Sequence, residues 1–147
     1  MKHSVLFICI HNSARSQMAE AFLKKYGQDY FSADSAGLEP GKMNKNVVTV
    51  MNEIGIDLSQ KPTKGVFEIF QSGQKYDGVI TVCDAGSAER CPVFPGKVKR
   101  EAWSFSDPSS FTGSQEEILQ RTRGVRDEIE TKIKDYVNRV KEVSYWV

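Results

Sequence analysis

Residues that could act chemically on a bound anion lie close together between positions 9 and 16. Five residues separate Cys9 from Arg15, and Ser16 follows directly, in the order Cys-x5-Arg-Ser. A short loop of this kind curls its backbone N–H groups toward its own centre, where they can cradle a tetrahedral oxyanion. Arg15 can close the cradle with a bidentate guanidinium. The positive field of the cradle favours the thiolate of Cys9, so the stretch predicts a nucleophile aimed at a bound oxyanion.

Two elements must position this loop. Residues 5–8 form a continuous apolar run, which is typical of a buried strand, and Ser16 opens a helical pattern that Gly27 stops. The helix N-terminus adds amide donors and a partial positive charge. The predicted oxyanion-binding residues therefore fill the space between strand and helix: Ile10, His11, Asn12, Ser13, Ala14, Arg15 and Ser16.

A simpler interpretation makes Cys9 a buried strand cysteine and Arg15 a solvated helix residue. The Cys-x5-Arg spacing alone does not separate the two interpretations. The strand–loop–helix context favours the functional one, as does the hydroxyl of Ser16, which is placed to hydrogen-bond a thiolate.

Strand and helix patterns alternate along the chain. The predicted strands cover residues 5–8, 30–35, 76–82 and 97–103, and the predicted helices cover residues 16–26, 45–54, 64–71 and 115–140. This alternation predicts an α/β fold: a doubly wound, four-stranded parallel sheet in the order 2-1-3-4 with helices on both faces. The length favours a single domain over residues 1–147. Such a fold binds its ligand outside the carboxyl ends of the strands.

Three further reactive residues fall on that same rim. Cys83 directly follows the third strand, and Asp107 comes shortly after the fourth. Paired strands lie about 4.8 Å apart, so Cys83 can approach Cys9 if the first and third strands are neighbours. Cys91 follows in a loop of small and polar residues, and a mobile loop can bring two cysteine Cα atoms within the roughly 7 Å that a disulfide needs. We predict a thiol relay with Cys9 as nucleophile, Cys83 as attacker of the adduct and Cys91 as resolver.

Each of these residues also has a simpler interpretation. Cys83 can be an inert core residue at a strand end. Cys9, Cys83, Cys91 and His11 could instead form a zinc site, but no short Cys-x₂₋₄-Cys pair exists, which favours the absence of a metal. Asp107 can simply initiate a turn with the proline that follows it. On the active rim it is better interpreted as a general acid for the leaving oxygen.

Composition excludes several other functions. The net charge of +1 provides no global field for nucleic acid or for a membrane surface. The apolar run of residues 5–10 is too short for a signal sequence or a transmembrane helix, so we expect a cytoplasmic protein. Three cysteines do not make a structural disulfide framework there. We further expect a monomer without a cofactor.

Residues 9–20 resemble the phosphate loop shared by low-molecular-weight protein tyrosine phosphatases and thioredoxin-coupled arsenate reductases. The part Asn-Ser-x-Arg-Ser-Gln-Met-Ala-Glu is closer to the reductases. Two positions depart from both families, because His11 replaces the usual glycine and Ala14 the usual second cysteine, so the loop cannot form an internal disulfide with Cys9. Beyond the loop, the resemblance to the reductases covers residues 35–39, 55–59, 82–83, 91–92, 103–108 and 123–129.

The resemblance implies reduction of arsenate to arsenite by the three-cysteine relay, with recharging by thioredoxin; the sequence does not distinguish thioredoxin from glutaredoxin as the reductant. Some members bind potassium beside the loop through residues that resemble Asn12, Glu20 and Ser35, but a further acidic ligand has no counterpart near residues 63–64. Two other functions stay open. One is a protein tyrosine phosphatase that hydrolyses phosphate monoesters through a Cys9 phosphoenzyme, and the other is an oxyanion-binding regulator.

The residues expected around the predicted oxyanion site favour the reductase over the phosphatase. An aryl phosphate needs aromatic walls, and the phosphatases usually have an aromatic residue after Asp-Pro, where this chain has Ser109. Residues 38–46 also lack an aromatic side chain. A small inorganic oxyanion such as arsenate needs no such walls. A binding regulator would not need Cys83, Cys91 and Asp107 in their places.

Overall fold

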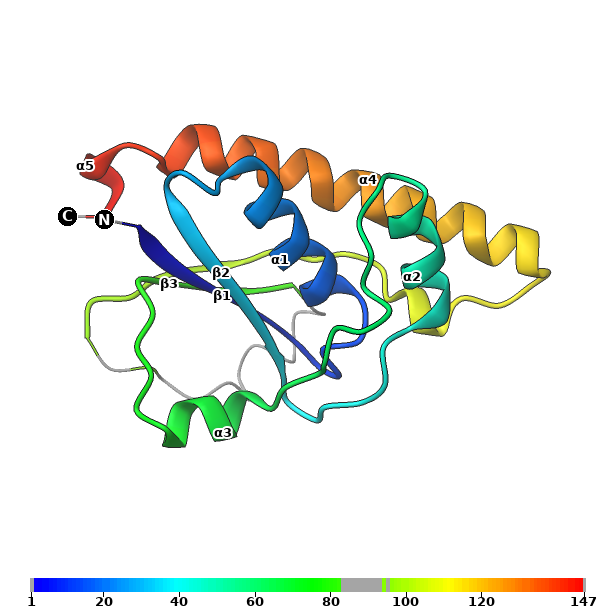
Figure 1. Cartoon of the computed structure of the whole chain (residues 1–147), viewed down its shortest axis with the longest axis horizontal. Coiled ribbons are helices and arrows are strands. Elements are labelled where there is room, and N and C mark those ends of the chain that lie inside the picture. Colours follow the sequence, from blue (N-terminus) through cyan, green and yellow to red (C-terminus); the bar gives the residue numbers. More distant parts are fainter. Residues whose placement is uncertain (1, 83–93, 95, 147) are drawn as a thin grey trace.

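The computed structural model describes residues 2–82, 94 and 96–146. A four-stranded sheet forms its centre, with helices around it (Figure 1). The strands are β1 (His3–Cys9), β2 (Phe31–Gly37), β3 (Gly78–Thr81) and β4 (Lys99–Ala102). Their order is β2-β1-β3-β4, and every pair is parallel. The predicted order and the predicted pairing of the first and third strands are both confirmed.

Helices cover both faces of the sheet. The α-helices are α1 (Arg15–Tyr26), α2 (Lys45–Asn52), α3 (Val66–Gln71), α4 (Gln115–Val140) and α5 (Val143–Trp146), and a 3₁₀ helix spans Pro108–Ser110. Figure 1 shows α1 and the long α4 on one side of the sheet and α3 on the other. The doubly wound arrangement that the sequence predicts is therefore present.

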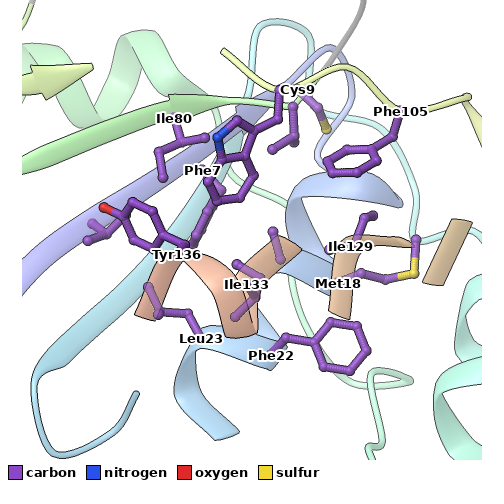
Figure 2. Close-up of a cluster of buried hydrophobic side chains, with 14 of the residues drawn as sticks. Phe7, Cys9, Met18, Phe22, Leu23, Ile80, Phe105, Ile129, Ile133 and Tyr136 are labelled. Carbon is purple, nitrogen blue, oxygen red and sulfur yellow. The ribbon is translucent and has the colours of Figure 1, made fainter. Parts of the chain in front are cut away.

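The central strand β1 separates two apolar clusters. Val5, Phe7 and Cys9 belong to the larger cluster, which lies between the sheet and helices α1 and α4, whereas Leu6 and Ile8 belong to a smaller one beside α3. The larger cluster is drawn in Figure 2, and its aromatic and aliphatic members include Met18, Phe22, Leu23, Ile80, Ile129, Ile133 and Tyr136. A parallel strand buried on both faces reads as a continuous apolar run, as here, and it fixes Cys9 rigidly at its carboxyl end.

One helix begins later than predicted because the chain first makes sheet-like contacts. The amide of Lys64 donates to Asn12 Oδ1 at 2.9 Å, and its carbonyl accepts from the amide of Gly37 at 2.8 Å. Gly65 then pairs with Gly37 in an isolated parallel bridge. These contacts keep residues 64 and 65 extended, so α3 starts at Val66 rather than at residue 64.

The other boundaries that differ do so by one or two residues. α2 ends at Asn52 rather than residue 54, and the chain then turns through Gly55, whose φ of 82° is in the left-handed region that favours glycine. β3 and β4 are shorter than predicted, whereas β1 extends further at both ends. The long helix has the predicted bounds, and its start at Ser114 is fixed by a capping box with Glu117.

The C-terminal turn α5 was not predicted and packs against the start of β1. The ring of Trp146 stacks on His3 with centroids 4.4 Å apart, and its Nε1 donates to the carbonyl of Val140 at 2.8 Å. On β4, the carboxylate of Glu101 gathers donors from this end of the chain: Arg139 at 2.9 and 2.8 Å and the hydroxyl of Tyr145 at 2.8 Å. Glu101 thus links β4 to the end of α4 and to α5.

Replacing Glu101 with glutamine is expected to lower the free energy of unfolding by about 1–2 kcal/mol at pH 7. Burial raises the pKa of Glu101, but hydrogen bonds from Arg139, Trp103 and Tyr145 outweigh it and hold the pKa below its ordinary value. A lowered pKa in the folded state stabilises the protein above the unfolded-state pKa of about 4.3, and this contribution is lost as the pH falls through the folded pKa.

Urea unfolding at pH 7 and at acid pH measures this effect. The wild-type protein should exceed the Glu101→Gln variant in stability at pH 7, and the difference should shrink steadily below about pH 4. A difference of the same size at both pH values would show that the charge of Glu101 contributes nothing.

Candidate active site

The loop between β1 and α1 is held from outside by the segment that follows β2. Four amides of this segment donate to four loop carbonyls at 2.7–3.0 Å: Leu38 to Cys9, Glu39 to Ile10, Gly41 to His11 and Asn44 to Ser13. The carbonyl side of the loop is therefore used in outward hydrogen bonds. This arrangement is the one expected if the amide side faces an anion at the centre.

Cys9 lies at the base of the loop, and its side chain is buried. Its sulfur accepts the backbone N–H of Asn12 at 3.2 Å and lies 2.9 Å from the hydroxyl of Ser16. Asn12 has a φ of 55°, in the left-handed region, which turns its amide back onto the sulfur. Gly37 makes room for this turn, since a Cβ there would lie 2.7 Å from the nitrogen of Asn12.

The side chain of Asn12 also contacts the hydroxyl of Ser16. Asn12 Nδ2 donates to Ser16 Oγ at 2.8 Å, so the oxygen of Ser16 acts as the acceptor in that bond. Either the Ser16 hydroxyl or a Cys9 thiol can donate in the 2.9 Å contact, but toward a Cys9 thiolate the hydroxyl must be the donor. Two donors, one amide and one hydroxyl, therefore converge on the sulfur when it is a thiolate.

Arg15 is buried at the start of α1 and faces the segment after β4. Its Nη1 donates to the carbonyl of Phe105 at 3.1 Å, and its Nη2 lies 3.7 Å from Asp107 Oδ2. The other carboxylate oxygen of Asp107 accepts the amide of Ser109 at 3.0 Å and caps the 3₁₀ helix. Asp107 therefore fulfils the turn role and also lies on the rim beside Arg15, with its side chain 30% exposed.

The N-terminus of α1 is open to an anion. No described side chain caps it at Ala14, and its first turn holds no acidic residue. Uncapped amides and the partial positive charge of a helix N-terminus together attract anions. In contrast, His11 is exposed, and its Nδ1 bonds the carbonyl of Glu39 at 2.9 Å on the outer side of the loop.

Cys83 and Cys91 lie outside the described residues. The chain leading to them is placed, because β3 pairs with β1 and the amide of Val82 donates to the carbonyl of Ile8 at 2.9 Å. Within the described part of the chain, no group of three or more His, Cys, Asp or Glu side chains could hold a metal ion. None of the described helices is both long enough and apolar enough to span a bilayer.

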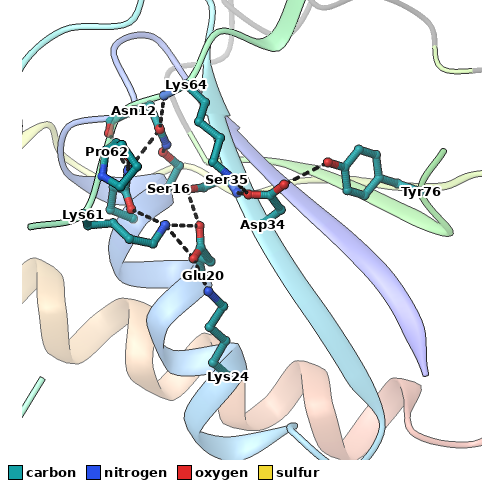
Figure 3. Close-up of polar contacts among 11 residues, drawn as sticks. Asn12, Ser16, Glu20, Lys24, Asp34, Ser35, Lys61, Pro62, Lys64 and Tyr76 are labelled. Atoms are coloured by element: carbon teal, nitrogen blue, oxygen red, sulfur yellow. Dashed lines mark hydrogen bonds and ion pairs between the residues drawn. The ribbon is translucent and has the colours of Figure 1, made fainter. Parts of the chain in front are cut away.

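A second polar cluster supports the loop from behind, and sequence reasoning missed most of it (Figure 3). Glu20 on α1 is 1% exposed, and its carboxylate accepts from Ser35 Oγ at 2.6 Å and from Lys24 Nζ at 2.6 Å. Lys61 Nζ lies 2.8 and 2.7 Å from its two oxygens. Lysines in a polar connection usually indicate solvated surface, so the sequence carries no signal that singles out Lys61.

These residues do not fit a potassium ion. Both oxygens of Glu20 are covered by ammonium groups and by Ser35, and Asn12 Oδ1 already accepts from Gln17 Nε2 at 3.0 Å and from the amide of Lys64. Oxygen ligands engaged by donors are not available to a cation. The ammonium of Lys61 lies against both oxygens of Glu20 and supplies the positive charge that a cation would bring.

Comparisons with known proteins agree with this geometry. The family model of the low molecular weight phosphotyrosine protein phosphatases matches residues 4–144. The arsenate reductase of Shouchella clausii (strain KSM-K16) is 42% identical over 135 residues, which cover 92% of this chain and 95% of that protein. A solved arsenate reductase in its oxidized state has a TM-score of 0.78 at 29% identity, with 95% of this chain and 98% of that chain covered.

A second solved structure, an arsenate reductase in the phosphate binding state, has a TM-score of 0.75 at 28% identity and covers 95% of this chain and 99% of that chain. These matches extend over nearly the whole chain. The family model matches residues 4–144, which include the loop that begins at Cys9. The chain therefore belongs to the low molecular weight phosphotyrosine protein phosphatase family and, within it, to the group of the arsenate reductases.

Proposed function

We propose that this protein reduces arsenate to arsenite and that Cys9 is the nucleophile. One observation carries the proposal: the Cys9 sulfur lies at the base of the loop between β1 and α1, with the amide of Asn12 at 3.2 Å and the hydroxyl of Ser16 at 2.9 Å. The relatives named as arsenate reductases support the choice of substrate, and the phosphate binding state of one of them supports a tetrahedral oxyanion in this loop.

In the first step, the Cys9 thiolate attacks the arsenic of a bound arsenate. A sulfur–arsenic bond forms and one arsenic–oxygen bond breaks, and Asp107 gives its proton to the leaving oxygen, which departs as water. Arg15 binds two arsenate oxygens and balances their negative charge. The loop residues Ile10 to Ser16 and the N-terminus of α1 bind the remaining oxygens.

In the second step, the Cys83 thiolate attacks the Cys9 sulfur. A Cys9–Cys83 disulfide forms, the sulfur–arsenic bond breaks, and its electron pair stays on arsenic, which leaves as arsenite. Cys91 then attacks Cys83 and releases the Cys9 thiolate, which moves the disulfide to Cys83–Cys91. A dithiol protein, thioredoxin or glutaredoxin, reduces that disulfide and supplies the two electrons of the cycle. We expect the protein to act as a cytoplasmic monomer.

The Cys91→Ser variant tests the order of the relay. It should release about one arsenite per enzyme and then stop with a Cys9–Cys83 disulfide, because no thiol remains to move that bond outward. The matched Cys83→Ser variant should stop earlier, with arsenic still on Cys9. Mass spectrometry of both variants after arsenate treatment separates these species. Repeated turnover of Cys91→Ser with thioredoxin would contradict the relay.

The phosphatase family itself favours hydrolysis of phosphate monoesters as a second candidate. Asp-Pro is followed here by the exposed Ser109, whose hydroxyl accepts from Asn44 Nδ2 at 2.9 Å rather than forming an aromatic wall. We therefore expect weak activity toward aryl phosphates. Assays with arsenate and with an aryl phosphate on the same preparation compare the two candidates directly, and a higher kcat/KM for the aryl phosphate would favour the phosphatase.

A further inference from the structure

We propose that Lys61 is a positioning residue whose ammonium group serves as a built-in counter-cation behind the oxyanion loop. It neutralises Glu20 and, through Gln17, holds Asn12 in the conformation that presents its amide to Cys9. The role of the loop in arsenate binding rests on the proposed function. The cluster of contacts itself is drawn in Figure 3.

Glu20 requires a positive partner because its side chain is only 2% exposed. A buried carboxylate is costly unless it is paired and hydrogen-bonded. Two lysines lie within hydrogen-bond distance, but they differ in their surroundings. Lys24 approaches from the same helix and is 54% exposed, whereas Lys61 comes from the connection after α2 and is 24% exposed.

Of the two lysines beside Glu20, Lys61 also connects this carboxylate to the loop. Its Nζ also donates to Gln17 Oε1 at 3.2 Å, and Gln17 Nε2 donates to the carbonyl of Asn12 at 3.1 Å and to Asn12 Oδ1 at 3.0 Å. A lysine ammonium has three donors and no acceptor, so it can face only the oxygen of the Gln17 amide. Lys61 and the three acceptors of Nε2 therefore favour the same amide orientation, because the reversed amide would place an oxygen against two oxygens of Asn12 and the carbonyl of Pro62 and an NH₂ group against the ammonium.

The backbone of Asn12 links these contacts to the nucleophile, because its amide donates to the Cys9 sulfur. Asn12 is held at a φ of 55°, which non-glycine residues adopt rarely and only when their surroundings enforce it. Gln17 supplies that support by binding both the carbonyl and the side chain of Asn12. Without Lys61 the loop should sample other shapes, and its affinity for an oxyanion should fall more than the rate of the chemical step.

The same contacts make an external alkali cation unnecessary. The oxygens of Glu20 and Asn12 are already engaged by donors, as described above, and the Lys61 ammonium supplies the positive charge. The KM of the wild-type protein for arsenate should therefore be the same in potassium chloride and in sodium chloride at equal ionic strength. A KM that is lower by about threefold or more in potassium than in sodium would overturn the proposal.

The Lys61→Met and Lys24→Met variants form a matched pair, because each removes one ammonium from Glu20 and retains a similar apolar stem. Lys61→Met should raise both the KM for arsenate and the dissociation constant of inorganic phosphate about tenfold, as expected for a lost charged hydrogen bond, with kcat little changed. Lys24→Met should change both constants by about twofold at most. Equal effects of the two variants, or a loss confined to kcat, would overturn the proposal.

Chemical rescue separates positioning from a general structural role. In Lys61→Ala, methylammonium chloride should restore phosphate affinity, whereas tetramethylammonium chloride at the same concentration should not, because it has no N–H to donate. Absence of any selective rescue would overturn the proposal. If the Lys61 variants do not fold, the KM of the wild-type protein for arsenate in potassium chloride and in sodium chloride still tests the proposal. Phosphate affinity is measured without turnover, so a wild-type protein that binds phosphate but does not reduce arsenate contradicts the proposed function rather than the role of Lys61.

Discussion

Replacing Cys9 with serine is expected to lower arsenate turnover by about 10⁴-fold or more while phosphate binding persists. A serine hydroxyl is not ionised near neutral pH, and its oxygen cannot enter the disulfide that carries the electrons. The donors around position 9 remain, because other contacts also hold them. Gln17 and the amide of Lys64 hold Asn12, Asn12 Nδ2 donates to Ser16 Oγ, and Arg15 donates to the carbonyl of Phe105. Arsenite release and titration calorimetry with phosphate measure the two effects separately.

The direction in which Cys9→Ser changes the affinity for phosphate is also informative. A thiolate at position 9 repels a dianion, so the Cys9→Ser variant should bind phosphate at least as tightly as the wild-type protein. The Ser16→Ala variant is a useful comparison, since it retains the nucleophile and removes one hydrogen bond to it together with the acceptor of Asn12 Nδ2. Residual turnover of Cys9→Ser above about 1% of wild type would assign the first attack to a different thiol.

The sheet order could be predicted because apolar runs and helical patterns alternate along the chain. A parallel sheet with right-handed crossovers leaves few topologies for such a pattern, and the capping box at Ser114 fixes the start of the long helix. Boundaries were less predictable where a side chain or backbone group bonds outside its own element. Lys64 is such a case, because its amide is used by Asn12 and its helix begins only at Val66.

The loop residues of the candidate site could be predicted from the sequence, but the residues that hold the loop in place could not. Cys9, Arg15 and Ser16 are close in the sequence, and their place between an apolar run and a helical pattern indicates a shared loop. The contacts of Gln17 and Lys61 join positions 44 residues apart. Nothing local distinguishes Lys61 from a solvated lysine, since its neighbours form a polar connection. Only the fold shows that this connection passes behind the loop.

The geometry of Asp107 is compatible with both interpretations that the sequence analysis offers for this residue. One carboxylate oxygen caps the 3₁₀ helix through the amide of Ser109, and the other lies 3.7 Å from Arg15 Nη2. A turn-forming aspartate and an aspartate on the active rim are therefore the same residue in the same conformation. A substitution that removes only one of the two roles can separate them.

The Asp107→Asn variant is expected to slow the formation of the Cys9–arsenic adduct by about 10²–10⁴-fold. Asparagine caps a helix about as well as aspartate, because its side-chain oxygen can still accept the amide of Ser109. It cannot release a proton to the leaving oxygen of arsenate. Rapid-quench measurements in a Cys83→Ser background, in which the adduct should accumulate, give the rate of this step alone.

The controls for this variant follow from the same contacts. Thermal unfolding of Asp107→Asn should match that of the wild-type protein, since the cap is retained and the contact with Arg15 at 3.7 Å is long for an ion pair. Ser109→Ala should keep the adduct rate, because its backbone amide still holds Asp107 and only the hydroxyl contact with Asn44 is lost. An unchanged adduct rate in Asp107→Asn would leave Asp107 as a capping residue and would require another proton donor beside Arg15.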